Sequence, residues 1–133
     1  MPNWCENTLT VTGEEKEVQR FKNLAKPKDQ KLDSKLSFES LYPIADKKHW
    51  YQWCKEHWGT KWDVEATLDE ISADYLEYAF ASAWSPPIEW LKKVSQDFPR
   101  LRFKLKYDEP GNGFFGVATA EQGDIEDKCL VYS

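Results

Sequence analysis

Residues 101–107 alternate between apolar and basic side chains, and this pattern constrains the fold more than any other part of the chain. A period of two is typical of a β-strand with one face against a core and the other face in water. Such a strand favours an antiparallel sheet that is covered on one side. The apolar face would hold Leu101, Phe103, Leu105 and Tyr107, and the basic face Arg100, Arg102, Lys104 and Lys106.

Similar patterns predict further strands. In the first of them, one face is expected to carry Cys5, Asn7, Leu9 and Val11, and the other Trp4, Glu6, Thr8 and Thr10. Both faces of the strand at residues 74–83 are expected to be buried. Turns rich in glycine, at residues 110–113 and 122–124, predict that the chain ends in a β-hairpin. The predicted strands are residues 4–12, 36–41, 62–66, 74–83, 101–107, 114–121 and 128–132.

Two amphipathic helices are expected to cover the sheet. The first spans residues 14–25, with Thr12 and Glu15 as a capping box. The other begins at Ser85 as N-cap, with Pro86 and Pro87 in its first turn, where proline is tolerated. The inner stripe of the first helix is Val18, Phe21 and Leu24, and that of the second is Ile88, Leu91, Val94 and Phe98.

A further helix is predicted over residues 47–58, with Asp46 as N-cap and Gly59 as the stop signal. Its apolar face repeats at helical spacing and is unusually rich in indoles. The residues of that face are Trp50, Trp53, Cys54, His57 and Trp58.

The order strand, helix, strand, strand, helix, strand predicts an α+β fold, the ferredoxin-like split βαβ sandwich. We expect the Trp-rich helix to belong to an insertion at about residues 44–70, between the second and third strands. The terminal hairpin would extend the antiparallel sheet. At 133 residues the chain is expected to form a single domain, residues 1–133.

Composition narrows the functional classes. The 23 acidic and 18 basic residues give a net charge of −5, which argues against a protein whose main role is to bind phosphates. The three cysteines lie far apart and suggest reduced thiols. No segment has the run of roughly 18 apolar residues that a membrane span needs, and the first residues lack a signal core, so a cytoplasmic location is expected. No cofactor and no membrane partner are expected.

Several unusual motifs carry a family resemblance. They are Met1 to Cys5 with Asn7, Trp58 to Asp63, Ala83 to Pro87, Tyr107 to Gly111, and Phe115 with Gly116. On these motifs the chain resembles the YubB ferredoxin-like family of bacteria, plasmids and phages. The resemblance implies the ferredoxin-like topology and no established reaction. The plasmid and phage setting makes a host protein or a nucleic acid the expected type of partner.

The leading hypothesis is a non-enzymatic binding module that uses aromatic and charged residues at the ends of elements. Indole faces can hold a base, a sugar or a methylated cation. The same indoles can equally be core residues, and Lys61 with Glu109 can be an ion pair that fastens the insertion to the sheet. The candidate binding residues are Trp58, Lys61, Trp62, Trp84, Tyr107 and Glu109.

Three alternatives stay open. A small enzyme would use Glu109 as its carboxylate beside Trp62 and Tyr107. If Met1 were removed, the amine of Pro2 could act as a base or nucleophile beside Glu6. A nucleic-acid-binding protein would use the basic face of the strand with Arg100, Arg102, Lys104 and Lys106, together with lysines of the 27–35 loop.

Metal binding has little support in the sequence. Cys54 and His57 lie three residues apart on one helix face, but His49 lies on another face and no second pair of ligands is evident. We therefore predict that there is no metal site.

Overall fold

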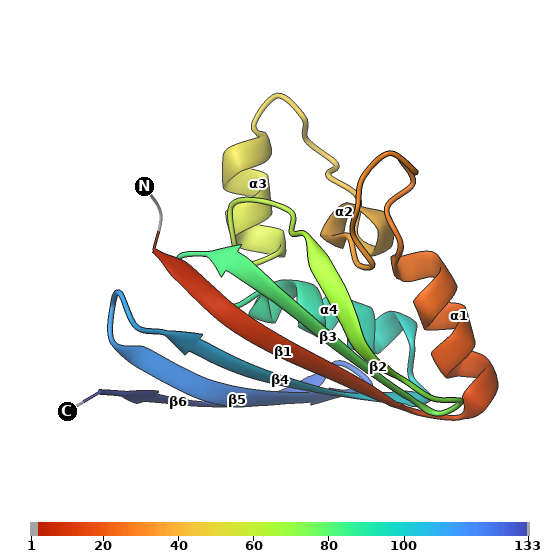
Figure 1. Ribbon diagram of the computed structural model, residues 1–133. Coiled ribbons are helices and arrows are strands. Elements are labelled where there is room, and N and C mark those ends of the chain that lie inside the picture. The colour runs from red at the N-terminus through yellow and green to blue at the C-terminus, as the bar shows by residue number, and fades with distance from the viewer. Residues whose placement is uncertain (1–2, 133) are drawn as a thin grey trace.

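The structure is a computed structural model that describes residues 3–132, and within this range one antiparallel sheet carries four helices (Figure 1). The strand order is β2-β3-β1-β4-β5-β6. In the described residues no helix has the length and apolar character needed to cross a membrane. The strands are β1 (Trp4–Gly13), β2 (Ala66–Ile71), β3 (Tyr75–Ala83), β4 (Leu101–Glu109), β5 (Phe114–Glu121) and β6 (Asp124–Val131). The helices are α1 (Glu15–Ala25), α2 (Phe38–Leu41), α3 (Trp50–His57) and α4 (Ile88–Asp97).

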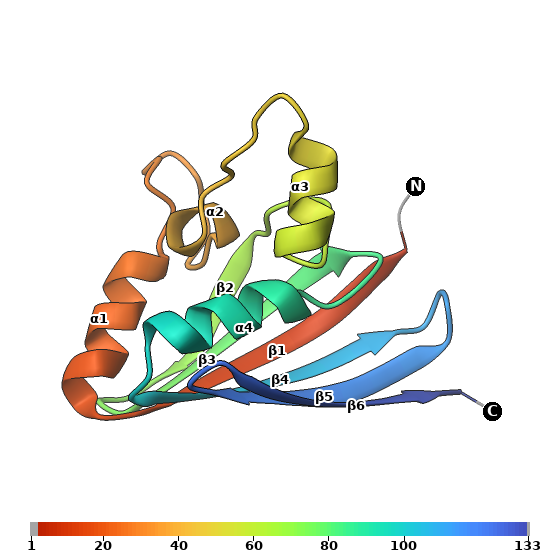
Figure 2. The same ribbon diagram turned by 180° about the vertical axis from the view of Figure 1, so that it is seen from behind.

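The elements β1, α1, β2, β3, α4 and β4 follow one another in the order of the ferredoxin-like fold, with β1 and β3 in the middle of their four strands. Figure 2 shows α4 lying across one face of the sheet, and α1 covers the same side. The opposite face is open. The hairpin of β5 and β6 extends the sheet beyond β4. The predicted fold class and the terminal hairpin are therefore confirmed.

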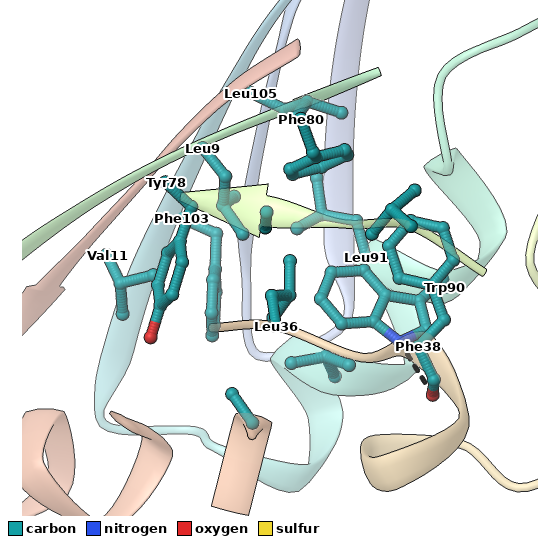
Figure 3. Packing of buried hydrophobic residues seen from close by; sticks show 14 of the residues in the cluster. Leu9, Val11, Leu36, Phe38, Tyr78, Phe80, Trp90, Leu91, Phe103 and Leu105 are labelled. Atoms are coloured by element: carbon teal, nitrogen blue, oxygen red, sulfur yellow. Dashed lines mark hydrogen bonds between the residues drawn. The ribbon is translucent and has the colours of Figure 1, made fainter. Parts of the chain in front are cut away.

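Aromatic rings fill the space between the sheet and its helices (Figure 3). The ring of Phe21 meets those of Phe98 and Phe103 edge-on, at 5.3 and 5.5 Å between centroids. The rings of Phe38 and Trp90 lie 4.8 Å apart. Trp90 is fully buried, and its indole N–H donates to the Phe38 carbonyl at 3.3 Å. Since each large ring removes about 150–250 Å² from water, these rings supply much of the hydrophobic stabilisation.

The predicted strand at residues 36–41 is wrong, because this segment contains the short helix α2. The Asp63 carboxylate accepts hydrogen bonds from the backbone N–H groups of Phe38 at 2.6 Å and Glu39 at 3.2 Å. The Ser37 hydroxyl also donates to it, at 2.7 Å. These bonds satisfy N–H groups that the start of a helix leaves unpaired. Because the carboxylate comes from a distant part of the chain, the local pattern could not reveal it.

The predicted strand at residues 62–66 is also wrong, since β2 begins only at Ala66. The inserted segment consequently lies between α1 and β2, and not between the second and third strands as predicted. Residues 66–70 belong to the sheet itself. The insertion runs beside β2, where the Lys35 N–H donates to the Ala66 carbonyl at 2.9 Å and the Ala66 N–H donates to the Ser34 hydroxyl at 2.9 Å.

The predicted helices exist, but their predicted caps do not form. Thr12 lies inside β1, and α1 begins without a side-chain cap. Asp46 accepts a bond from the His49 N–H at 3.1 Å, ahead of α3. The Ser85 hydroxyl donates to the Gly59 carbonyl at 2.5 Å and caps nothing. Asp46 and Ser85 are hydrogen-bonded to other groups of the folded chain, and neither supplies a side-chain cap to its helix.

Some inward and outward assignments also differ from the prediction. Leu24 is exposed, and the neighbouring Ala25 takes its place against the core. The outer face of β3 is half-buried where full burial was predicted, because no helix covers it. Trp90, which the predicted stripe of α4 omitted, is among the largest fully buried residues.

The buried hydroxyl of Tyr78 has no hydrogen-bond partner among the described residues, and burial raises its pKa. A desolvated hydroxyl without a partner costs stability. We therefore predict that Tyr78→Phe raises the free energy of unfolding by about 1 kcal/mol, measured by urea denaturation. Tyr107→Phe is the matched control, because its hydroxyl donates to Asp127 and its loss should destabilise. A Tyr78→Phe protein less stable than the wild type would contradict the prediction.

Candidate functional site

The inserted segment forms a cleft of about 490 Å³ with mainly apolar walls, which we call the insertion cleft. It lies between the loop that follows α1, helices α2 and α3, and the segment just before β2. A volume of this order can hold a small molecule or the side chains of a peptide. Its large apolar lining residues are Leu32, Ile44, Trp50, Trp58 and Trp62, and its charged lining residues are Lys28, Asp29, Glu39, Lys61 and Asp63.

Trp58 forms the rigid base of the insertion cleft. Its side chain is buried, and its indole N–H donates to the Tyr42 carbonyl at 2.9 Å. Helix α3 ends just before it, because Gly59 adopts a φ of +83° and donates its N–H to the Cys54 carbonyl. Few residues other than glycine adopt such a φ without strain. The predicted stop at Gly59 is confirmed, and the chain turns there into the wall formed by Lys61 and Trp62.

Lys61 is held among aromatic rings. Its ammonium lies 4.4 Å from the ring centre of Trp62 and 4.8 Å from that of Tyr51. The ammonium of Lys55 also lies over Tyr51, at 5.4 Å. Cation–π contacts of this kind hold a positive charge near an apolar surface. No ion pair joins Lys61 to Glu109 among the described residues.

Exposed aromatic side chains continue from the insertion cleft. Trp50 is 41% exposed, although its helical position predicted a buried side chain. Its neighbour Tyr51 is also exposed, and the Trp4 ring lies 6.2 Å from that of Trp62. Sequence reasoning missed Trp4, Trp50 and Tyr51 as surface residues. The adjacent pair Trp50 and Tyr51 was the available signal, because consecutive helical residues do not share one face.

The thiol of Cys54 is buried at the border of the insertion cleft. Burial raises its pKa to about 11, and the negative charges of Glu39 and Asp63 act in the same direction. The His57 imidazole stacks on Trp53 at 4.2 Å, and its Nδ1 is bonded to the Trp53 carbonyl at 2.8 Å. Cys54 and His57 therefore do not converge. No group of three ligating side chains suited to a metal occurs within residues 3–132.

Tyr107 lies apart from the insertion cleft and links β4 to β6. It is buried, and its hydroxyl crosses β5 to donate to Asp127 of β6 at 2.5 Å. Burial and this bond raise the pKa of Tyr107. The ring lies over Gly116, where any side chain would collide with the Tyr107 hydroxyl and the Lys128 carbonyl. The pairing of Tyr107 with Gly116 is thus a packing requirement.

Glu109 is fully buried, and both carboxylate oxygens accept the Asn112 N–H, at 3.1 and 3.0 Å. This bond closes the turn between β4 and β5, with Gly111 close against Glu109. Trp62 lines the insertion cleft, whereas Tyr107 and Glu109 are not among its lining residues. The structure does not bring these three residues into one pocket. Pro2 lies outside the described residues.

Trp84 is 46% exposed and has a φ of +70°, which is unusual for a bulky residue. Its N–H donates to the Asn3 carbonyl at 2.8 Å. The next residue, Ser85, is held on both sides, because its carbonyl accepts the Ser82 hydroxyl and its own hydroxyl donates to Gly59. These bonds hold the left-handed backbone and direct the indole toward solvent.

The residues of the predicted basic face lie on the open face of the sheet, and Arg100 lies just before β4 begins. Arg100 pairs with Glu14 at 3.5 Å, and Arg102 with Glu121 at 3.2 Å. Lys104 and Lys106 form no ion pair among residues 3–132. With Thr8, Thr10, Tyr75 and Glu77 they line a hollow of about 270 Å³.

Thiol reactivity tests this description. Burial raises the pKa of Cys5 to about 12 and that of Cys54 to about 11, so at pH 8 both remain protonated and shielded. Cys129 is exposed. With dilute native protein and iodoacetamide, we predict alkylation of Cys129 more than tenfold faster than of either other thiol, measured by peptide mass spectrometry. Unfolding in urea should equalise the three rates. Rapid native labelling of Cys54 would show that the insertion cleft reaches deeper than described.

Comparison with known proteins places the chain in a family. Residues 54–131 match the family described as Ferredoxin-like domain in Api92-like protein. The crystal structure of the protein api92 from Yersinia pseudotuberculosis has a TM-score of 0.73 and 11% identity, over 100% of this chain and 99% of that one. At this identity the likeness shows the fold alone. No curated protein matches. Because the family match covers more than half of the chain, this chain belongs to the Api92-like family, in which it carries the ferredoxin-like domain.

Proposed function

We propose that this chain is a non-enzymatic binding module whose insertion cleft accepts an apolar side chain from an acidic segment of a partner protein. The observation that carries the proposal is the insertion cleft itself, with the exposed Trp50 on its wall and the Lys61 ammonium beside Trp62. Neighbouring exposed apolar side chains at the rim of a cleft are a common feature of interaction sites.

Charge supports an acidic partner. Residues 26–62, which build most of the insertion cleft, contain eight lysines and five acidic residues, a net charge of +3. Because the whole chain carries −5, the remaining residues carry −8. A positive region on a negative protein favours an acidic partner and orients its approach. Three carboxylates line the insertion cleft, those of Asp29, Glu39 and Asp63, beside the two lysines Lys28 and Lys61. Each carboxylate accepts backbone N–H groups: Asp29 from Lys31, Glu39 from Ile44, and Asp63 from α2 and Val64.

The chemistry of the candidate residues favours binding over catalysis. Cys54 is a protonated thiol, Tyr107 is bonded to Asp127, and Glu109 closes a turn. A catalytic group must reach its substrate, and these groups are committed to packing. The description of the family names a fold and not a reaction.

The proposal also includes the origin of the protein and its location in the cell. The motif resemblance to the YubB family suggests a plasmid or phage origin and a cytoplasmic location, and there the partner would be a host protein.

Selection of phage-displayed random peptides against the full chain tests the proposal. We expect enriched sequences to have an aromatic or large aliphatic residue flanked by Asp and Glu. A synthetic peptide of the selected sequence should lose at least tenfold in affinity to Trp50→Ala and to Lys61→Glu, measured by fluorescence anisotropy. Tyr132→Ala, an exposed aromatic on the opposite edge of the sheet, is the matched control and should bind normally. Selection without enrichment, or binding unaffected at Trp50, would overturn the proposal.

Nucleic-acid binding on the open face is the second candidate, favoured by the hollow that the unpaired Lys104 and Lys106 line with Thr8 and Thr10. This candidate predicts retention on a polynucleotide column that weakens steeply with added salt. The double variant Arg102→Glu with Lys104→Glu should abolish retention, while Arg20→Glu on α1 should not. Elution that does not depend on salt or on these substitutions would remove this candidate.

A further inference from the structure

Strand β6 is an outer edge of the sheet, and within residues 3–132 no strand pairs with its free side. It has eight residues and pairs with β5 in regular register along its whole length. Its side chains are largely exposed, with Leu130 at 60% and Val131 at 76%. A long, regular, uncovered edge strand is a template for another strand.

The other outer edge, β2, is protected. Its register with β3 shifts between Leu68 and Glu70, and both backbone groups of Ala66 are bonded to residues of the preceding insertion. Bulges and covering loops are ways in which proteins block pairing at an edge. Within residues 3–132 β6 has neither device, and the protection that it does have is its charged residues Asp124, Glu126, Asp127 and Lys128. A strand of complementary charge can therefore still pair with this edge.

The backbone fixes which residues of β6 face outward. The Tyr132 N–H donates to the Gly113 carbonyl at 2.7 Å, in line with the register of β5 and β6. Along an antiparallel strand, residues bonded to one neighbour alternate with residues that point to the other side. The even-numbered residues therefore bond to β5. The residues that direct their N–H and C=O groups to the free edge are Ile125, Asp127, Cys129 and Val131.

Two tyrosines hold this edge in place from opposite faces. Tyr107 donates to Asp127 on the helix side of the sheet. On the open side, Tyr132 is hydrogen-bonded to Asp108 and stacks on Phe115 at 5.2 Å. A strand held in this way loses little conformational freedom when another strand joins it.

The charges of β6 match those of a second copy of the same strand, and the exposed ion pair that Lys128 forms with Glu126 of its own chain at 3.5 Å would be exchanged for pairs between the copies. In an antiparallel pair with a two-fold axis at Asp127, Glu126 of each copy lies opposite Lys128 of the other. The axis therefore creates two pairs of opposite charge. These are non-hydrogen-bonded positions, where facing side chains come closest, about 4.5 Å between Cα atoms. An axis one residue further on would instead bring the two Lys128 side chains together at that short spacing.

The repulsion between the two Asp127 carboxylates at the axis is weaker than the attraction within the two pairs of Glu126 and Lys128. The two Asp127 residues would occupy a hydrogen-bonded position, where the Cα atoms are about 5.5 Å apart. Each carboxylate already accepts a bond from Tyr107. The same register places Ile125 opposite Cys129, an apolar pair.

We propose that two copies of this chain associate through β6 in the antiparallel register centred on Asp127, so that their sheets become continuous. The contact is isologous, as in most two-fold dimers. It does not depend on the function proposed for the insertion cleft, which lies toward the β2 edge.

Charge reversal tests the interface. Sedimentation velocity should show a dimer of the wild-type chain, and Glu126→Lys or Lys128→Glu alone should raise its dissociation constant at least tenfold. An equimolar mixture of the two variants should form a heterodimer, because each mutated strand is complementary to the other. A monomeric wild-type chain, or a dimer insensitive to both reversals, would overturn the proposal.

Disulfide trapping tests the register. Hydrogen-bonded neighbours have a Cα spacing that suits a disulfide. Oxidation of Ile125→Cys with copper phenanthroline should therefore link residue 125 of one copy to Cys129 of the other. The control Ile125→Cys with Cys129→Ser should remain unlinked. A dimer in which the control links equally well would contradict the register centred on Asp127.

Discussion

The contact of Trp90 with the inserted segment is the interaction on which the rest of the structure depends. Its indole packs 4.8 Å from the ring of Phe38 and donates to the Phe38 carbonyl, while its backbone N–H donates to the Trp58 carbonyl at 3.3 Å. Helix α4 thereby holds both α2 and the end of α3. A buried indole must find an acceptor for its N–H, and here the acceptor belongs to the insertion. The insertion cleft is thus supported by the core of the ferredoxin-like fold.

The unusual motifs divide between packing and surface. Gly59 turns the chain after α3, and Gly116 leaves room for the ring of Tyr107. Trp84, in contrast, is held at a φ of +70° with its indole in solvent. Backbone strain of this kind persists only where surrounding bonds enforce it. The motifs therefore shape the turns at the ends of the strands and of α3, and a few of their side chains remain exposed and able to contact a partner.

The two proposed surfaces lie at opposite edges of the sheet and do not compete. The insertion runs beside β2, and β6 is the far edge. A dimer joined at β6 would carry its two insertion clefts at the outer ends of a continuous sheet. Two sites on one particle bind a repeated or dimeric partner more tightly than one site, provided that the partner can span them.

The sequence by itself determined the strands whose side chains alternate, such as Leu101–Glu109, and the helices whose apolar residues recur at helical spacing. Such periodicity records which face of an element is buried, whatever packs against it. Only the tertiary structure decided that residues 38–41 are helical, because the bonds that start α2 come from Asp63. It also decided that Trp58, just after α3, is buried while Trp50, at the start of α3, is exposed. That outcome depends on what faces each indole across the fold, which no local pattern contains.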